Sequence, residues 1–588
     1  MANLKYLPFC IALALTPACA QQTVRPPQPA VAENPAPRVE APESASVEPD
    51  AERRVEPTPN LPAQALTPDI LFKFLVAEVA GQRGATGIAS AAYLDLAQET
   101  RDPRIARRAA EVAMFARDRA AALEATRLWS AADPASERAR QTLAAMLLNE
   151  GRLDEAEPVL REVLASDPAA GFMHLSALLG KVRDASAARA LVERLAAAHP
   201  QVAEARYAVA QAAANAGDMP AALAALEKAN GLRPGWEPGA LLRTQILART
   251  APADALAFMR DFLATYPEAR DVRLAYARAL VNANQFAEGR AQFERLAGEL
   301  PRNAEVSFAA GLLALQMGEP IAARDWLNRA LDADPRDRDT IHYYLGQAAE
   351  QLKETDVAAT HYAQVEAGNY LVPARARQAA LLAAAGRRDE ARALLAATQG
   401  ANDAQNVRLV QAQAELLRDG KERQAAFDAL SEGLKRYPDS PELLYDRAMA
   451  AEKLDRLDVL EADLRRVIAL RPDDAHAYNA LGYTLADRTP RLAEAIELLE
   501  HALKLAPDDA FILDSVGWAQ YRAGNFARAQ EFLERAYQAR PDPEIAAHLG
   551  EVLWARGRQD EAGRLWQTSL QSHPQNEVLL ETLRRLKP

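Results

Sequence analysis

The sequence predicts an all-α solenoid of about fifteen helical hairpins that follow one another along the chain. Three observations support this: a repeat of about 34 residues, prolines at matching intervals, and apolar surface supplied mainly by Ala and Leu. Hydrophobic residues make up 49% of the 588 residues and aromatic residues only 6%. Small apolar side chains let helix backbones approach closely, whereas long β-sheets would need more β-branched and aromatic residues.

Prolines recur where each Ala/Leu-rich helix is expected to end, because the residue before a proline disfavours helix. Most steps are 33 to 35 residues and the shortest is 31. The series is Pro68, Pro103, Pro134, Pro168, Pro200, Pro234, Pro267, Pro301, Pro335, Pro438, Pro472, Pro507, Pro541 and Pro574. The one long gap, from residue 335 to residue 438, holds about three periods, with Asn369 and Asp403 where prolines would fall.

Two further landmarks follow each proline position at fixed distances. A glycine lies 17 residues on, where a tight turn between two helices needs an unhindered backbone. These glycines are Gly151, Gly217, Gly318, Gly386, Gly420 and Gly524, with Gly557 one residue early. An alanine lies 22 residues on, where the two helices are expected to cross closely. These alanines are Ala156, Ala190, Ala222, Ala323, Ala391, Ala425 and Ala529.

This order of landmarks in a two-helix unit is similar to the tetratricopeptide repeat. We expect the first hairpin from roughly Leu66 and a terminal helix near Asn576 to Leu586. The clearest unit ends at Pro541, whereas residues 168–200 and 234–301 fit the pattern poorly and are expected to be irregular. The resemblance implies a right-handed superhelix whose concave groove is lined by the first helix of each pair.

The N-terminus reads as an export signal over residues 1–20. Lys5 precedes a short apolar run over residues 7–15, too short to span a bilayer. Residues 21–65 form a predicted disordered tether rich in Pro, Ala and Glu, which at about 3.1 Å per residue reaches on the order of 100 Å. Divergent helical repeats are expected over residues 66–300 and tetratricopeptide repeats over residues 301–588.

Two interpretations of the processing site remain open. Ala18-Cys19-Ala20 is an A-x-A cleavage site that would release a soluble chain. Alternatively, residues 15–19 resemble a bacterial lipobox, in which Cys19 is lipidated and becomes the first residue. Thr16 and Pro17 depart from the usual lipobox. Because Cys19 is not followed by Asp, a lipidated chain resembles lipoproteins sorted to the outer membrane.

Composition and motifs exclude most other classes of function. The formal charge of −12 argues against nucleic acid as a partner, which would need a basic stripe. The repeat region contains no cysteine and none of the zincin, nucleophile-elbow or Walker motifs. Asp332, Asp334 and Asp337 lack the remaining ligands of a calcium loop. We therefore expect no enzyme activity, no cofactor and no metal site.

Groove-facing positions of the last repeats carry aromatic side chains beside polar ones. In a tetratricopeptide unit, positions 2, 5, 9 and 12 of the first helix point inward. We call the residues predicted there the C-terminal strip, with His548 included although it lies one residue out of register: His476, Asn479, Tyr483, Phe511, Asp514, Trp518, Tyr521, His548, Glu551 and Trp554. Aromatic side chains supply large contact area at low entropic cost, so the strip is predicted to bind protein. The alternative is that Tyr521 and Trp554 pack in the core.

Three stretches resemble a narrower family. The first is residues 71–83 (LFKFLVAEVAGQR), followed by residues 98–103 and 107–113. The second is residues 479–487 (NALGYTLAD), followed by LDSVGW at 513–518 and by Tyr521 and Arg522. The third is residues 544–554 (EIAAHLGEVLW). Together they resemble the LbcA-type exported tetratricopeptide lipoproteins of proteobacteria. That family implies an outer-membrane adaptor that binds a periplasmic carboxyl-terminal processing protease. The adaptor brings it substrates, notably peptidoglycan hydrolases, and a shared scaffold raises their effective concentration at the protease.

The sequence leaves two other classes of function open. A structural assembly factor would pilot or scaffold an outer-membrane secretion, pilus or polysaccharide machine and would leave proteolysis unchanged. An enzyme with an unrecognised site would show activity as the purified chain alone. The adaptor is the leading hypothesis, and membrane attachment in it depends on lipidation of Cys19.

Overall fold

The computed structural model describes residues 61–180 and 182–586, and every regular element among them is an α-helix. The first ten helices are α1 (Pro68–Gln82), α2 (Thr86–Thr100), α3 (Pro103–Phe115), α4 (Arg119–Ala132), α5 (Glu137–Asn149), α6 (Leu153–Ser166), α7 (Pro168–Leu179), α8 (Ala185–Ala197), α9 (Ala203–Asn215) and α10 (Met219–Leu232). The next ten are α11 (Glu237–Thr250), α12 (Pro252–Thr265), α13 (Arg270–Asn282), α14 (Phe286–Glu299), α15 (Ala304–Gln316), α16 (Pro320–Asp332), α17 (Arg338–Gln351), α18 (Thr355–Ala363), α19 (Leu371–Ala384) and α20 (Arg388–Ala397). The last eleven are α21 (Asp403–Asp419), α22 (Arg423–Arg436), α23 (Pro441–Glu452), α24 (Leu457–Leu470), α25 (Ala475–Arg488), α26 (Leu492–Leu505), α27 (Ala510–Arg522), α28 (Phe526–Ala539), α29 (Pro543–Ala555), α30 (Gln559–Ser572) and α31 (Glu577–Leu586).

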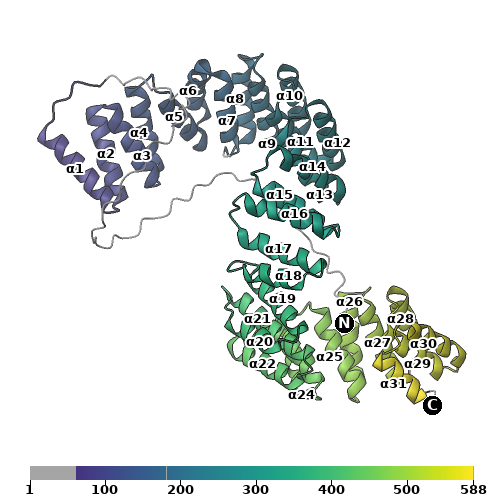
Figure 1. Cartoon of the computed structure of the whole chain (residues 1–588). Coiled ribbons are helices and arrows are strands. Elements are labelled where there is room, and N and C mark those ends of the chain that lie inside the picture. The colour runs from purple at the N-terminus through teal and green to yellow at the C-terminus, as the bar shows by residue number, and fades with distance from the viewer. Residues whose placement is uncertain (1–60, 181, 587–588) are drawn as a thin grey trace.

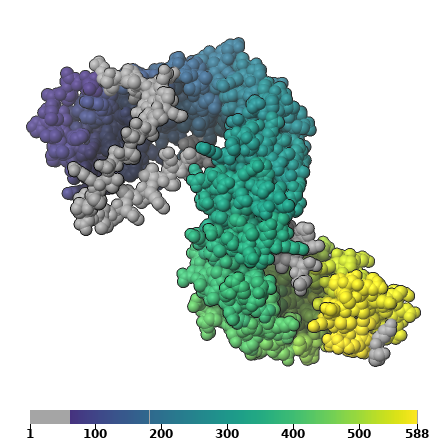
Figure 2. Space-filling view, viewed as in Figure 1, coloured from purple at the N-terminus to yellow at the C-terminus, as the bar shows by residue number. Residues whose placement is uncertain are grey.

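The helices pair in chain order into an extended, curved array (Figure 1). Helices α1 to α30 follow one another as fifteen two-helix units and α31 comes last, which confirms the predicted all-α solenoid and its terminal helix. In one unit the two helices do not pair: α7 packs on α9 instead of α8, within residues 168–200, which were expected to be irregular. The stack runs from α1 toward α10, turns, descends through α15 to α18, and turns again toward α31. The two ends of the described chain lie far apart on the surface view (Figure 2). Within the described ranges, no helix is both long and apolar enough to cross a bilayer.

Most hairpin turns place one residue in the left-handed backbone region. Six of the seven predicted turn glycines do so, for example Gly217 and Gly524 with φ of 83° and 82°. Gly420 does not: it caps α21 in the right-handed region, and Lys421 takes φ of 63° instead. The glycine prediction at residue 420 was therefore wrong by one residue, because α21 ends at Asp419 and Gly420 serves as its cap.

Close crossing of the paired helices occurs at alanine, as predicted, in five of the seven units. Ala156, Ala222, Ala323, Ala391 and Ala529 are fully buried. Two predicted positions were wrong. Ala190 is exposed and Ala425 only half-buried, while Ala188 and Ala426 are buried in their places. The units that contain Ala190 and Ala425 depart from the regular spacing. The position that contacts the partner helix is therefore shifted by one or two residues in each.

Three prolines of the repeat series open helices instead of ending them. Pro68, Pro103 and Pro168 occupy the first turn of α1, α3 and α7, each behind a residue whose side chain caps the helix. This corrects the expectation that Pro68 ends a helix. The first helical position needs no backbone N–H donor, and proline's fixed φ is already helical there.

The export signal, Cys19 and residues 21–60 of the predicted tether lie outside the described residues. The predicted boundary at residue 300 falls in the turn between α14 and α15. The division into divergent and regular repeats stays a prediction.

The buried apolar residues form a series of clusters shared by neighbouring hairpins. One joins α4 to α9 around Leu147, Phe172 and Leu191. Another joins α28 to α31 around Trp566 and Leu579. Since each repeat buries its apolar faces mainly against its neighbours, stability along the array is local.

Candidate functional site

The ten residues of the C-terminal strip lie on three first helices. His476, Asn479 and Tyr483 are on α25, four residues are on α27, and His548, Glu551 and Trp554 are on α29. Helix α25 packs on α27, and α27 packs on α29, so successive first helices lie side by side. The structure brings part of the strip into one contact cluster and leaves the rest at its rim.

Asp514, Trp518 and His548 form the centre of this cluster, and all three are buried. The His548 Nδ1 atom lies 2.9 Å and 3.0 Å from the two carboxylate oxygens of Asp514. The indole of Trp518 stacks on the imidazole with 4.3 Å between ring centroids and 24° between planes. An imidazolium held between a carboxylate and an aromatic face is stabilised by both.

The charge of this cluster depends on His548. Burial alone would lower the pKa of its imidazole, but the Asp514 carboxylate, by charge and hydrogen bonding, outweighs burial and raises that pKa. Glu551 and Glu544 add to the effect. Burial in turn raises the pKa of the Glu544 carboxyl. The Asp514 carboxylate and the His548 imidazole therefore form a buried ion pair when the imidazole is protonated.

Asp487 at the end of α25 links the cluster to the preceding hairpin. Its carboxylate accepts a hydrogen bond of 3.1 Å from the Trp518 indole N–H. Arg522 donates to the Asp487 backbone carbonyl at 2.7 Å and forms an ion pair with the carboxylate at 3.4 Å. Reasoning on inward positions missed Asp487 because it lies beyond position 12. The sequence feature that could have indicated Asp487 is its position as the last residue of NALGYTLAD, one of the stretches that resemble the narrower family.

Glu551 and Trp554 connect the strip to the end of the array. Glu551 is only 3% exposed, and its carboxylate accepts a hydrogen bond of 2.5 Å from Arg585 on α31. Trp554 is half-buried and stacks on the buried Trp566 of α30 at 5.8 Å. Both residues thus make contacts that hold α29, α30 and α31 together.

The remaining residues of the strip differ in how accessible they are. Phe511 is 45% exposed with the Arg540 guanidinium 4.7 Å above its ring, and His476 is also exposed. Tyr483 and Tyr521 are half-buried. The Asn479 side-chain oxygen is enclosed and finds no hydrogen-bond donor among the described residues. The buried cluster of Asp514, Trp518 and His548, with accessible aromatic side chains beside it, suits the docking of a polypeptide.

A second polar and aromatic cluster, missed by the sequence reasoning, lies in the middle of the array. The hydroxyls of Tyr344 and Tyr370 are 2.9 Å apart, and the Tyr343 ring stacks on Tyr370 at 4.6 Å. Tyr362 donates to Glu350 at 2.5 Å, and Arg377 pairs with the same carboxylate at 2.8 Å. Its tyrosines come from α17, α18 and the turn before α19, so only tertiary packing gathers them. It ties three helices rather than lining a groove.

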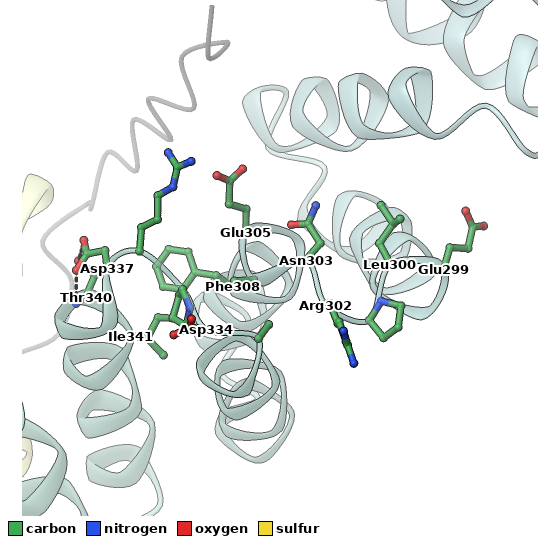
Figure 3. Close-up of a pocket in the computed structure, with 15 residues that line it drawn as sticks. Glu299, Leu300, Arg302, Asn303, Glu305, Phe308, Asp334, Asp337, Thr340 and Ile341 are labelled. Atoms are coloured by element: carbon green, nitrogen blue, oxygen red, sulfur yellow. Dashed lines mark hydrogen bonds between the residues drawn. The ribbon is translucent and has the colours of Figure 1, made fainter. Parts of the chain in front are cut away.

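A cavity of about 890 Å³ lies between two successive inter-hairpin turns (Figure 3). Its wall includes Phe308, Ile341, Asp334 and Asp337. Asp337 is engaged as the cap of α17, accepting from the Thr340 N–H at 3.0 Å. Among the described residues, no group of three or more His, Cys, Asp or Glu side chains is placed to hold a metal ion.

Comparison with known proteins identifies the type of repeat. The tetratricopeptide repeat family matches residues 177–235, 274–338, 445–510 and 517–577. Among solved structures, a tetratricopeptide repeat protein from Parabacteroides merdae is 15% identical and covers 48% of this chain and 99% of its own, with a TM-score of 0.33. A thermophilic tetratricopeptide repeat protein from Thermus thermophilus is 24% identical and covers 32% of this chain and 97% of its own, with a TM-score of 0.28.

A relative in sequence spans nearly the whole array. The TPR repeat-containing protein PA4667 of Pseudomonas aeruginosa is 38% identical over 486 residues, which are 82% of this chain and 82% of that protein. The shared stretch is long enough to hold most of the fifteen hairpins. The chain belongs to the tetratricopeptide repeat family.

Proposed function

We propose that the chain is a non-catalytic adaptor that binds a periplasmic carboxyl-terminal processing protease and presents substrates such as peptidoglycan hydrolases to it. Tetratricopeptide repeats are protein-binding scaffolds, so membership of the family supports a role in protein binding. The adaptor role rests on the resemblance of residues 71–113, 479–518 and 544–554 to LbcA-type lipoproteins. The protease would hold the catalytic residues, and this chain would supply proximity.

The observation that carries the binding proposal is the construction of the C-terminal strip. Asp514, His548 and Trp518 lock together as a floor, and Phe511 and His476 remain accessible beside them. Pre-ordered side chains lose little entropy when a partner docks, so affinity is concentrated at such sites.

We further propose that the mature chain resides in the periplasm, anchored to the outer membrane through a lipid on Cys19. The apolar run before Cys19 and the Pro-rich stretch after it support this placement. Mass spectrometry of the mature N-terminus tests it. A lipidated Cys19 supports anchoring, whereas an unmodified N-terminus at Gln21 contradicts it.

A reconstituted degradation assay tests the adaptor role. It combines the mature chain, the periplasmic carboxyl-terminal protease of the same cell and a candidate cell-wall hydrolase, with each component omitted in turn. Hydrolase loss that needs both the chain and the protease supports the proposal. A chain that neither binds the protease nor changes its rate contradicts it and favours an assembly scaffold for envelope machinery.

A pair of matched variants locates the binding surface. Phe511→Ala removes an exposed aromatic side chain from the strip, and Phe115→Ala removes a still more exposed one at the end of α3. If the strip binds either protein, Phe511→Ala weakens that binding by about 2 kcal/mol, a typical hot-spot loss. Equal effects of the two variants would contradict a role for the strip.

A further inference from the structure

The first hairpin of the array exposes an apolar face. On α1, Leu71, Phe72, Leu75 and Val79 fall at spacings of one, three and four residues, so they share one side of the helix. Phe72 is 65% exposed, and Ile88 on the neighbouring α2 is 60% exposed. Contiguous exposed apolar side chains of this kind mark an interaction surface rather than scattered surface residues.

A groove adjoins this face and shares Phe72 and Ile88 with it. A cavity of about 490 Å³ lies between α1 and α2, lined by Phe72, Val76 and Ile88 with Gly87, Ala91 and Ala92. Small residues on α2 leave the space that a larger side chain would otherwise fill. The groove is thus shaped to admit the side chains of another helix.

The opposite end of the array shows what would cover such a face. There α31 packs on α29 and α30, burying Leu579 and placing Arg584 and Glu581 outward. Terminal repeats need a cover of this kind because their outer faces otherwise meet water. Among residues 61–180 and 182–586, no helix takes the corresponding place beside the groove of α1 and α2.

The charge at the edge of the groove indicates the chemistry of its occupant. Lys73 is paired with three carboxylates: Asp69 at 3.2 Å, Asp95 at 2.9 Å and Glu99 at 2.8 Å. One positive charge against three negative charges leaves this edge with an excess of two negative charges. Lys73 and Asp95 also line the cavity, so the acidic edge and the apolar groove form one surface.

We propose that the groove of α1 and α2 docks an amphipathic helix of a partner protein, with an apolar face and a basic flank. The apolar face enters the groove beside Phe72 and Ile88, and Lys or Arg side chains on the flank meet Asp69, Asp95 and Glu99. An anionic membrane surface is disfavoured at this acidic edge. The docked helix extends the solenoid at its start as α31 completes it at its end.

Two short Leu/Ala-rich helical peptides test this chemistry on the intact mature chain. They share one apolar face and differ only in a flank of Lys or of Glu. Fluorescence anisotropy is expected to show that the Lys peptide binds about tenfold more tightly than the Glu peptide, with the difference shrinking at high salt. Absence of Lys-peptide binding, or equal affinity for both peptides, overturns the proposal.

Variants identify the surface and the alternative occupants. Phe72→Asp is expected to weaken Lys-peptide binding at least about tenfold, whereas Ile321→Asp, at an exposed apolar residue of α16, leaves it unchanged. Equal losses overturn the assignment. Phe72-dependent self-association in sedimentation, or Phe72-dependent binding to phosphatidylethanolamine and phosphatidylglycerol vesicles without peptide binding, also overturns it. None of these readouts uses a protease, so they stand apart from the adaptor assay.

Discussion

At the scale of single residues, His548 couples the C-terminal strip to pH. Its pKa lies above that of the unfolded chain, which is about 6.5. The ion pair with Asp514 therefore stabilises the fold most below that pH, and its contribution is lost as pH rises through the raised pKa. The sign is opposite to that of a carboxylate whose pKa is depressed, which stabilises toward higher pH.

We predict that His548→Gln removes this pH dependence. At pH 6 the variant should be about 2 kcal/mol less stable than the wild type, and at pH 9 the difference should be smaller. Urea unfolding at the two pH values measures it. Asp514→Asn should flatten the same profile. A wild-type advantage that is constant between pH 6 and pH 9 would show that the imidazole is neutral in the fold.

Among the glycines, Gly550 is the one at which packing leaves the least room for a β-carbon. A β-carbon there would lie 2.0 Å from the indole nitrogen of the fully buried Trp566. Gly550→Ala should therefore destabilise the last hairpin by about 3 kcal/mol through overpacking. Gly231→Ala, at an exposed helical position with open space, should instead stabilise by about 0.5 to 1 kcal/mol. Thermal unfolding of the two variants checks both signs.

At the scale of the element, a hairpin turn depends on one left-handed residue more than on glycine itself. Lys421 takes this conformation with φ of 63°, at a cost that glycine avoids. Lys421→Gly should stabilise the turn between α21 and α22 by about 0.5 to 1 kcal/mol. The same change at Lys228, exposed inside α10, should destabilise by about 1 kcal/mol. Two changes of the same sign in urea unfolding would contradict this account.

At the scale of the whole molecule, local packing should confine the effect of a mutation. Arg585→Ala leaves the Glu551 carboxylate buried without its partner, which should cost about 3 kcal/mol in the last hairpins. Hydrogen exchange should then speed up in α29 to α31 and stay unchanged in α5 to α8. Faster exchange along the entire array would show that the solenoid unfolds as one cooperative unit.

The sequence predicted the array better than the site. The proline, glycine and alanine landmarks located fifteen hairpins and the terminal helix, because each landmark serves a local backbone need. The landmark predictions were wrong by one or two residues at Gly420, Ala190 and Ala425, where the units depart from the regular spacing. The choice of inward positions as a binding strip stays a prediction, and it did not separate Trp518, which is buried, from Phe511, which is exposed.

By itself, the sequence determined that this protein is an all-α array of repeated hairpins, since turn chemistry and helix periodicity act over one repeat. Only the tertiary structure decided that Asp514 contacts His548, 34 residues away, and that Asp487 accepts a hydrogen bond from the Trp518 indole N–H. It also decided that, among residues 61–180 and 182–586, no helix covers the exposed face of α1, while α31 covers the other end. Such contacts depend on how neighbouring repeats rotate against each other, and that rotation is set by the packing of many side chains together.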